Sequence, residues 1–280
     1  MATPLALARA AAPARGRPVA GPLHAVAGPL DAVTEAVRAA SRRAGPDAPL
    51  GLADPLVVAD PASGGWISAA SLVDGAALPV LLNGPVERWG AMPHAAAALA
   101  WKAYTYWLAV PAVTGLACVN RVPLLDADNV LVRLSHKSPF VTIGMRRPAV
   151  AVLPDDPYAG DPATTVVADR DGLLGALRVS LVDRHLALLA AATQARVRIG
   201  SRALAGALAA SVGYVLSLTG PLAPDSPTQL GKPILDALNI ADLVELTDTP
   251  DGSVDVRRRT CCLAFTVPGL TICTGCCIQP

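Results

Sequence analysis

The chain has 280 residues and a mass of 28.5 kDa, enough to bury one large core or two modest ones. Hydrophobic residues make up 52% and charged residues 16%, which excludes an intrinsically disordered chain. The formal net charge of +1 argues against a protein that binds nucleic acid or another polyanion through a basic surface.

Residues 1–21 are rich in proline and alanine, and we expect a mobile N-terminus there, ahead of a single domain over residues 22–280. Three arginines interrupt the apolar stretch that a secretory signal requires, so a reducing cytoplasm is the expected compartment. Residues 103–120 and 203–223 are uncharged and long enough to span a membrane, but both are built largely from small residues and contain proline. We therefore expect two buried helices of a soluble protein.

In chain order, residues 29–43 predict an amphipathic helix, because apolar side chains recur there at spacings of three and four. A loop rich in proline, glycine and aspartate is expected over residues 45–65. Helices are expected over residues 68–83 and 93–118. Cys118, at the end of the second of these helices, is expected to be a small buried residue.

Three short valine-rich stretches, 129–134, 140–145 and 149–154, predict strands. Residues 169–195 predict a long helix with Asp171 as its N-cap. Four leucines are expected on one face of that helix: Leu174, Leu177, Leu181 and Leu188.

Residues 201–218 predict another helix, and the run that begins at Ser226 has the form of a capping box. Two strand-like stretches, 243–249 and 253–260, flank a Pro-Asp-Gly turn and predict a hairpin. Together these elements predict an α-rich α+β fold: a helical bundle-like body, a small β portion, and a C-terminal hairpin that leads into a cysteine motif.

Five of the six cysteines fall in the last 20 residues, as Cys261-Cys262, ten residues, Cys273, two residues, Cys276, and then Cys277. A Cys-x-x-Cys turn places two sulfurs on one side of a metal. Neighbouring side chains of an extended backbone point to opposite faces, so the adjacent pair suits a target larger than one zinc ion. Disulfides are not expected in a reducing compartment. The residues alone leave three interpretations open: an iron–sulfur cluster, a zinc site and a redox-active thiol pair.

The stretch "VRRRTCCLAFTVPGLTICTGC" resembles the C-terminal motif of the FhuF family of ferric siderophore reductases. The stretches "WKAYTYWLAVPAVTG" and "SVGYVLSL" are similar to two helices of that family. In the family, the four cysteines of the motif bind a [2Fe–2S] cluster, which implies a cluster-binding segment over residues 257–277 here. The implied ligands are Cys261, Cys262, Cys273 and Cys276. Cys277 departs from the family pattern and is an alternative ligand.

The resemblance implies an enzyme, a cytoplasmic ferric siderophore reductase that releases iron from imported Fe(III)–siderophore complexes by one-electron reduction. It implies no catalytic residue apart from the cluster ligands. Because the sequence has no nucleotide-binding glycine motif, electrons are expected from a donor protein of the ferredoxin or flavin reductase type. Peripheral association with a membrane siderophore importer is expected, and a nucleic acid partner is not. The alternative is a zinc-binding structural or interaction module, or a C-terminal redox-thiol protein.

Arg257, Arg258 and Arg259 precede the first cysteine. They are expected either to tune the potential of an anionic cluster or to dock an acidic electron donor. Strand alternation predicts that Arg257 and Arg259 lie on the side of Cys261.

Aromatic residues gather in the helix expected over residues 93–118. Trp101, Tyr104 and Trp107 either pack in the core or form a wall of the pocket that holds a siderophore. His185 is expected to be a hydrogen-bonded core residue, because it lies beside the leucine face of its helix.

Overall fold

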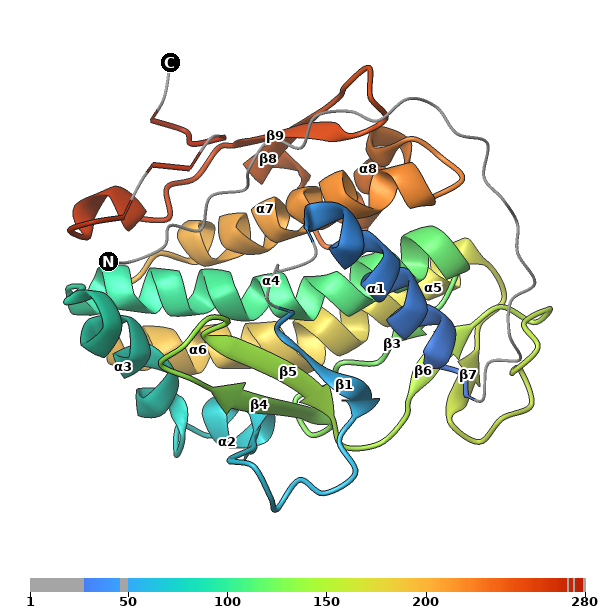
Figure 1. Ribbon diagram of the computed structural model, residues 1–280, viewed down its shortest axis with the longest axis horizontal. Helices are drawn as coiled ribbons and strands as arrows, with labels where there is room; N and C mark the ends of the chain where they lie inside the picture. The colour runs from blue at the N-terminus through green and yellow to red at the C-terminus, as the bar shows by residue number, and fades with distance from the viewer. Residues whose placement is uncertain (1–27, 46–49, 271, 274, 279–280) are drawn as a thin grey trace.

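The computed structural model describes residues 28–45, 50–270, 272–273 and 275–278. The N-terminus predicted over residues 1–21 lies outside these residues. Buried side chains from Leu30 to Val256 form one hydrophobic core. Helices dominate this core and small sheets flank it, so the predicted α-rich α+β fold is confirmed (Figure 1).

Two long helices, α4 and α7, lie side by side through the centre of the body, and the other helices surround them (Figure 1). The α-helices are α1 (Asp31–Ala44), α2 (Ala69–Val73), α3 (Leu78–Trp89), α4 (Pro93–Val119), α5 (Arg170–Leu177), α6 (Ala187–Arg196), α7 (Ser201–Thr219) and α8 (Pro227–Ala237). A π-helix, η1 (Arg178–Leu186), joins α5 to α6, and three short 3-10 helices are η2 (Gly220–Leu222), η3 (Ala241–Leu243) and η4 (Ala264–Thr266).

The strands form three small sheets, with orders β1-β5-β4-β2, β3-β6-β7 and β8-β9. They are β1 (Leu52–Val57), β2 (Ile67–Ser68), β3 (Val122–Pro123), β4 (Val130–Leu134), β5 (Val141–Met145), β6 (Val150–Val152), β7 (Thr164–Val166), β8 (Val244–Asp248) and β9 (Val254–Arg258). The three predicted valine-rich strands and the C-terminal hairpin are confirmed as β4, β5, β6 and the pair β8-β9.

Two predictions for the first third of the chain are wrong. The loop expected over residues 45–65 contains strand β1, which pairs in parallel with β5. Such pairing depends on a strand some 90 residues away in the chain, so the local run of proline and glycine did not reveal it. The single helix expected over residues 68–83 is divided into α2 and α3 by a turn that contains Gly75, whose φ is 87°.

The helix expected over residues 169–195 begins at Arg170, with an N-cap two residues before the predicted one, and changes its pitch at η1. Asp169, not Asp171, is the N-cap, and its side chain accepts a hydrogen bond from the Gly172 N–H at 2.9 Å. The π-helix η1 then adds residues to each turn and shifts the buried face. As a result Leu188, which α-helical spacing placed on the buried face, is exposed. Leu189 is buried in its place.

Two predicted local features are confirmed. Ser226 caps α8 in a full capping box with Gln229. His185 is completely buried, and its Nδ1–H donates to the Leu125 carbonyl oxygen at 2.7 Å while Nε2 accepts from the Tyr104 hydroxyl at 2.7 Å. Burial lowers the pKa of His185 to about 4, so this ring is neutral in the folded protein.

Within the described residues, one helix, Ser201–Leu222, is long and apolar enough to cross a membrane, and 72% of it is buried inside the protein. The small residues of this helix allow the C-terminal hairpin to pack closely against it. A Cβ added at Gly206 would lie 2.0 Å from the Thr260 hydroxyl oxygen, so only glycine lets the chain after β9 approach α7 this closely.

Candidate metal centre

The cysteine-bearing segment begins where β9 ends and lies over the body at the end where α4 starts (Figure 1). Apart from the single 3-10 turn η4, its described residues form no helix or strand. A separate small apolar cluster attaches it to α4. The buried members of this cluster are Ala91, Ala95, Ala96, Leu99, Cys262, Ala264 and Val267. The helix surface under the segment is therefore lined by alanine, which leaves room for the cysteine side chains.

Cys262 and Cys273 bring their sulfurs to 3.8 Å from each other. Two thiolates held at ~2.3 Å by one tetrahedral metal ion also lie about 3.8 Å apart. Cys262 is buried and Cys273 is half-buried. These two side chains, eleven positions apart in the chain, therefore already have the spacing of two ligands of one metal.

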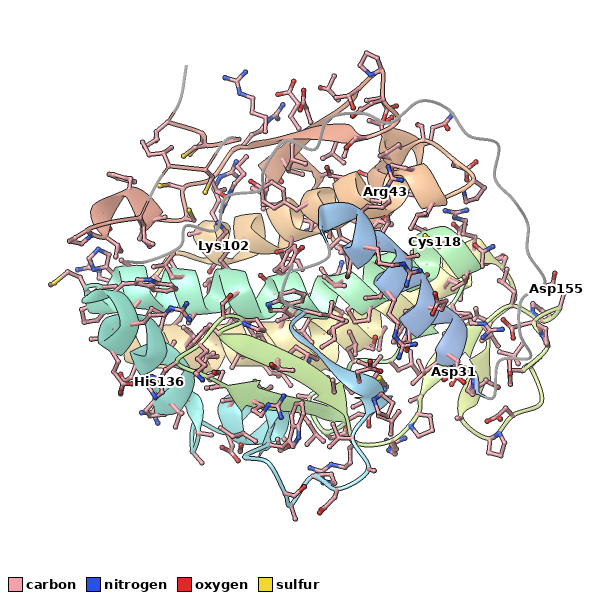
Figure 2. All side chains as sticks on the ribbon, in the orientation of Figure 1. Asp31, Arg43, Lys102, Cys118, His136 and Asp155 are labelled. Carbon is pink, nitrogen blue, oxygen red and sulfur yellow. The ribbon has the colours of Figure 1, made fainter. Side chains whose placement is uncertain are left out.

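The other three thiols lie beside this pair. The Cys276 N–H donates to the Cys273 carbonyl oxygen at 3.1 Å, which closes the Cys-x-x-Cys turn. Burial raises the pKa of the Cys277 thiol, and the neighbouring Cys261 and Cys276 thiols raise it further. Cys276 is buried, whereas Cys261 and Cys277 are half-buried. All five thiols therefore lie in the segment that follows β9, with Cys262 and Cys273 in contact, while Cys118 lies at the far end of α4 (Figure 2).

Backbone contacts hold the Cys-x-x-Cys turn against β9. The Arg258 N–H donates to the Gly275 carbonyl oxygen at 2.9 Å. A Cβ at Gly275 would lie 1.9 Å from the Val256 carbonyl oxygen, so the residue before Cys276 must be glycine for the turn to reach the strand. The hairpin therefore positions the second half of the motif.

Two cations from different elements act on the Cys262–Cys273 pair. The Lys102 ammonium on α4 lies 3.5 Å from the Cys273 sulfur. A hydrogen bond from Cys273 lowers the pKa of Cys262 to about 4, and the charges of Lys102 and Arg258 lower it too. The same shared hydrogen bond, together with burial, raises the pKa of Cys273. The two thiols therefore differ in acidity, and Cys262 is the more acidic of the pair.

Arg258 is the arginine of the run that faces inward. Its relative exposure is 2%, whereas Arg257 and Arg259 are exposed. The buried face of β9 carries Val254, Val256 and Arg258, and the same alternation of burial continues after the strand through Thr260 to Cys262. The predicted side for Arg257 and Arg259, that of Cys261, agrees with this alternation. Arg259 instead forms an exposed ion pair with Glu245 at 3.6 Å.

No hydrogen-bond partner for any of the three guanidinium nitrogens of Arg258 exists among the described residues. A buried charge without a partner is costly, because the guanidinium has lost its water and gained nothing in exchange. An anionic group bound by the adjacent thiols would compensate this charge.

The aromatic residues proposed as a pocket wall do not line an open pocket. Trp101 is buried, and its indole N–H donates to the Leu204 carbonyl oxygen at 2.9 Å. Tyr104 is wholly enclosed beside His185. Trp107 is half-buried and packs against the backbone of Gly51. Core packing is therefore the role that the structure gives Trp101 and Tyr104.

Sequence reasoning missed Lys102, although a signal was present. It is one of three lysines in the chain and the only charged residue between Arg88 and Arg121. A single charge in so long an apolar stretch indicates a specific partner.

Among the described residues, no three side chains of histidine, cysteine, aspartate or glutamate form a ready-made metal site. The structure instead brings together one thiol pair at ligand spacing, three further thiols and an uncompensated arginine. This all-sulfur donor set suits soft metal ions and iron–sulfur clusters, and the buried cation suits their negative charge. The residues therefore fit a thiolate-bound metal centre.

Comparison with known proteins adds little. No protein-family model matches the chain, and no curated protein matches it. Among solved structures, aerobactin synthetase IucA from a hypervirulent pathotype of Klebsiella pneumoniae is similar, with a TM-score of 0.42 and 18% sequence identity. The match covers 72% of this chain and 36% of that one, so this chain spans about a third of the matched structure. A similarity this distant carries no argument about activity.

Proposed function

We propose that this chain is a [2Fe–2S] protein that reduces the Fe(III) of siderophore complexes. The observation that supports the metal centre most directly is the 3.8 Å separation of the Cys262 and Cys273 sulfurs, which suits two ligands of one iron. Cys261 and Cys276 would complete the ligand set of the cluster, with Cys277 as the alternative. The choice of substrate rests on the resemblance of the cysteine motif to the FhuF family.

The chain's own residues would shield the metal centre from water on one side, supply positive charge to its thiolates, and leave one edge open to solvent. Ala95, Ala96 and Leu99 of α4 cover one side of the segment and exclude water from Cys262. Arg258 and Lys102 supply positive charge to the thiolates. Cys261, Cys273 and Cys277 are half-buried, so one edge of the centre lies close enough to solvent for electron exchange.

When bound, a [2Fe–2S] cluster would take one electron from a donor protein and pass one electron to Fe(III), which becomes Fe(II). Siderophore oxygens are hard ligands that hold Fe(III) far more tightly than Fe(II), so this reduction labilises the iron. With Trp101 and Tyr104 enclosed in the core, the substrate must approach the exposed edge of the cysteine segment. Phe265 is half exposed there, at 50%, and Ile272 is exposed at 44%.

The partners follow from the same proposal. The electron donor is a ferredoxin or a flavin reductase, because the sequence has no nucleotide-binding motif of its own. The protein works in the cytoplasm, where a ferric siderophore arrives through a membrane importer with which it associates peripherally.

Anaerobic purification from iron-replete cells, followed by iron, sulfide and zinc analysis, tests the cofactor. We expect about two irons and two acid-labile sulfides per chain. Stoichiometric zinc without sulfide would replace the proposal with a zinc-bound structural or interaction module. Single-turnover reduction of a ferric siderophore by the chemically reduced protein then tests the substrate. A protein that holds the cluster but leaves Fe(III) unreduced would keep the cofactor and overturn the reductase.

A further inference from the structure

We infer that Arg258 is the charge-compensating residue of the cysteine centre. Its buried guanidinium offsets the negative charge of thiolates that bind a metal. This inference rests on the proposed metal centre and assigns a specific role to one arginine of the Arg257–Arg259 run. The other two arginines of the run then serve no purpose at the centre.

The burial of Arg258 is the first argument. At 2% exposure its side chain is among the largest that the protein encloses completely, and none of its guanidinium nitrogens has a partner among the described residues. A side chain with five N–H donors in a fixed fork is rarely buried without an acceptor. Its acceptor therefore lies outside the described residues, and an anionic group held by the thiols is the acceptor that this inference assigns.

The position of Arg258 is the second argument. The backbone N–H of this residue is bonded to Gly275, so it is tied directly to the Cys-x-x-Cys turn. Its charge also acts on Cys262, on Cys277 and on Tyr214 of α7, so the guanidinium lies near both halves of the cysteine motif and near that helix. No hydrogen bond links it to a carboxylate of the described residues.

Lys102 provides a second, weaker cation on the opposite element. Its ammonium group contacts the Cys273 sulfur from α4 (Lys102 is labelled in Figure 2), whereas Arg258 belongs to β9. Lys102 is half-buried and keeps access to water, whereas Arg258 has none. Because solvent screens charges that it reaches, the buried guanidinium should dominate the electrostatics of the centre.

The metal-free and metal-loaded forms should respond in opposite directions to loss of this charge. Arg258→Met removes an uncompensated buried cation from the metal-free protein, which should raise its melting temperature. In the loaded protein the same substitution removes the counter-charge of the thiolates, which should lower the melting temperature. A merely structural arginine would shift both forms in the same direction.

A reduction potential gives an independent readout. Adding an electron makes a thiolate-bound cluster more negative, so a nearby cation favours the reduced state. We expect Arg258→Met to lower the equilibrium constant for reduction at least tenfold, which is a shift of about 59 mV for a one-electron couple. Arg258→Lys should restore most of this shift. Arg257→Met, an exposed neighbour on the same strand, is the matched control and should leave the potential unchanged.

The experiment measures melting temperatures of full-length wild type, Arg258→Met, Arg258→Lys and Arg257→Met without metal, loaded with the cluster, and loaded with zinc. Zinc is redox-inert, so its arm separates this inference from the proposed function. If the centre binds zinc only, the opposite shifts persist and only the reductase fails. If the cluster forms but Arg258→Met and Arg257→Met behave alike, the inference fails and the proposed cofactor stands. Should Arg258→Met not fold, Arg258→Gln, which also removes the charge but keeps a polar side chain, must show the same two changes, or the inference is wrong.

Discussion

Arg121 and Arg258 are both buried, but only the first has its partners within the described chain. Arg121 donates to both oxygens of Asp156, at 2.7 and 3.1 Å, and to the Pro29 carbonyl oxygen at 2.9 Å. Its guanidinium carbon also lies 4.9 Å from the centre of the Tyr158 ring. Arg258, at the edge of the cysteine segment, has no hydrogen-bond partner among the described residues.

The two regions differ in how they compensate a buried positive charge, although each also leaves buried hydroxyl groups without a hydrogen-bond partner among the described residues. The helical body compensates its buried arginine with its own carboxylate, and it pairs His185 with Tyr104 and a carbonyl oxygen. The region around the cysteines leaves Arg258 and the Thr260 hydroxyl without partners, and it contains little regular structure. Under the proposed function, a metal bound by the thiols would supply the negative charge that Arg258 lacks.

Replacing a cysteine of the close pair should have the largest effect. We expect Cys262→Ser and Cys273→Ser to lose the metal centre, because each removes one of two sulfurs at ligand spacing, while helix content by circular dichroism stays unchanged. Cys118→Ser, at the other end of α4, should retain full iron and sulfide. Cys277→Ser should be tolerated if Cys276 is the ligand. Full metal content in Cys262→Ser would contradict the proposal that Cys262 and Cys273 bind the same metal.

Replacing Arg121, the buried arginine that has its partners, should destabilise the helical body in both the metal-free and the metal-loaded protein. Arg121→Met leaves Asp156 as a buried carboxylate without its cation, and we expect a loss of ~3–5 kcal/mol in the free energy of unfolding. Denaturant unfolding with and without metal measures this loss. Arg42→Met removes an exposed pair with Glu35 and should cost less than ~1 kcal/mol. An effect of Arg121→Met seen only in the loaded protein would contradict the division into two regions.

Acid should destabilise the body through His185. The pKa of its ring falls from 6.5 in the unfolded chain to about 4 in the folded protein, so below pH 6.5 the unfolded chain binds more protons. The stability that neutral His185 contributes is therefore present above pH 6.5 and is lost as the pH falls toward 4, by roughly 3 kcal/mol in total.

Unfolding curves of wild type and His185→Gln between pH 7 and pH 4 test this dependence. The difference in stability between the two proteins should shrink as the pH falls. His136→Gln changes an exposed ring and should parallel the wild type across the range. A constant difference between wild type and His185→Gln would show that His185 does not titrate differently on unfolding.

The smallest expected effect concerns the glycine before Cys276. Gly275→Ala places a Cβ 1.9 Å from the Val256 carbonyl oxygen, so the Cys-x-x-Cys turn must move away from β9. We expect a loss of ~1–3 kcal/mol, visible as weaker metal retention during dialysis against a chelator. Gly175→Ala in α5 has nothing within 4 Å of the new Cβ and should stabilise the body by ~0.5–1 kcal/mol. Equal metal retention in both variants would mean that the hairpin does not position the turn.

Much of the fold could be predicted from short-range patterns. The apolar spacing of α1, the capping box of α8, the valine-rich strands and the Pro-Asp-Gly hairpin depend on residues within a few positions of one another. Strand β1 and the π-helix η1 could not be predicted in this way. Strand β1 depends on a partner strand far away in the sequence. The π-helix has more residues per turn than an α-helix, so the α-helical spacing of apolar residues does not predict its buried face.

For the candidate site, the sequence by itself determined the donor chemistry. Five thiols spaced as an adjacent pair and a Cys-x-x-Cys indicate a soft metal or an iron–sulfur cluster, whatever the surrounding fold. Only the tertiary structure decided which side chains meet. It brought Cys262 to Cys273, turned Arg258 inward in place of its two neighbours, added Lys102 from a helix 171 positions away from Cys273, and enclosed Trp101 and Tyr104 in the core. The reason is physical: ligand identity is a property of each residue, whereas burial and charge compensation arise only when distant segments pack together.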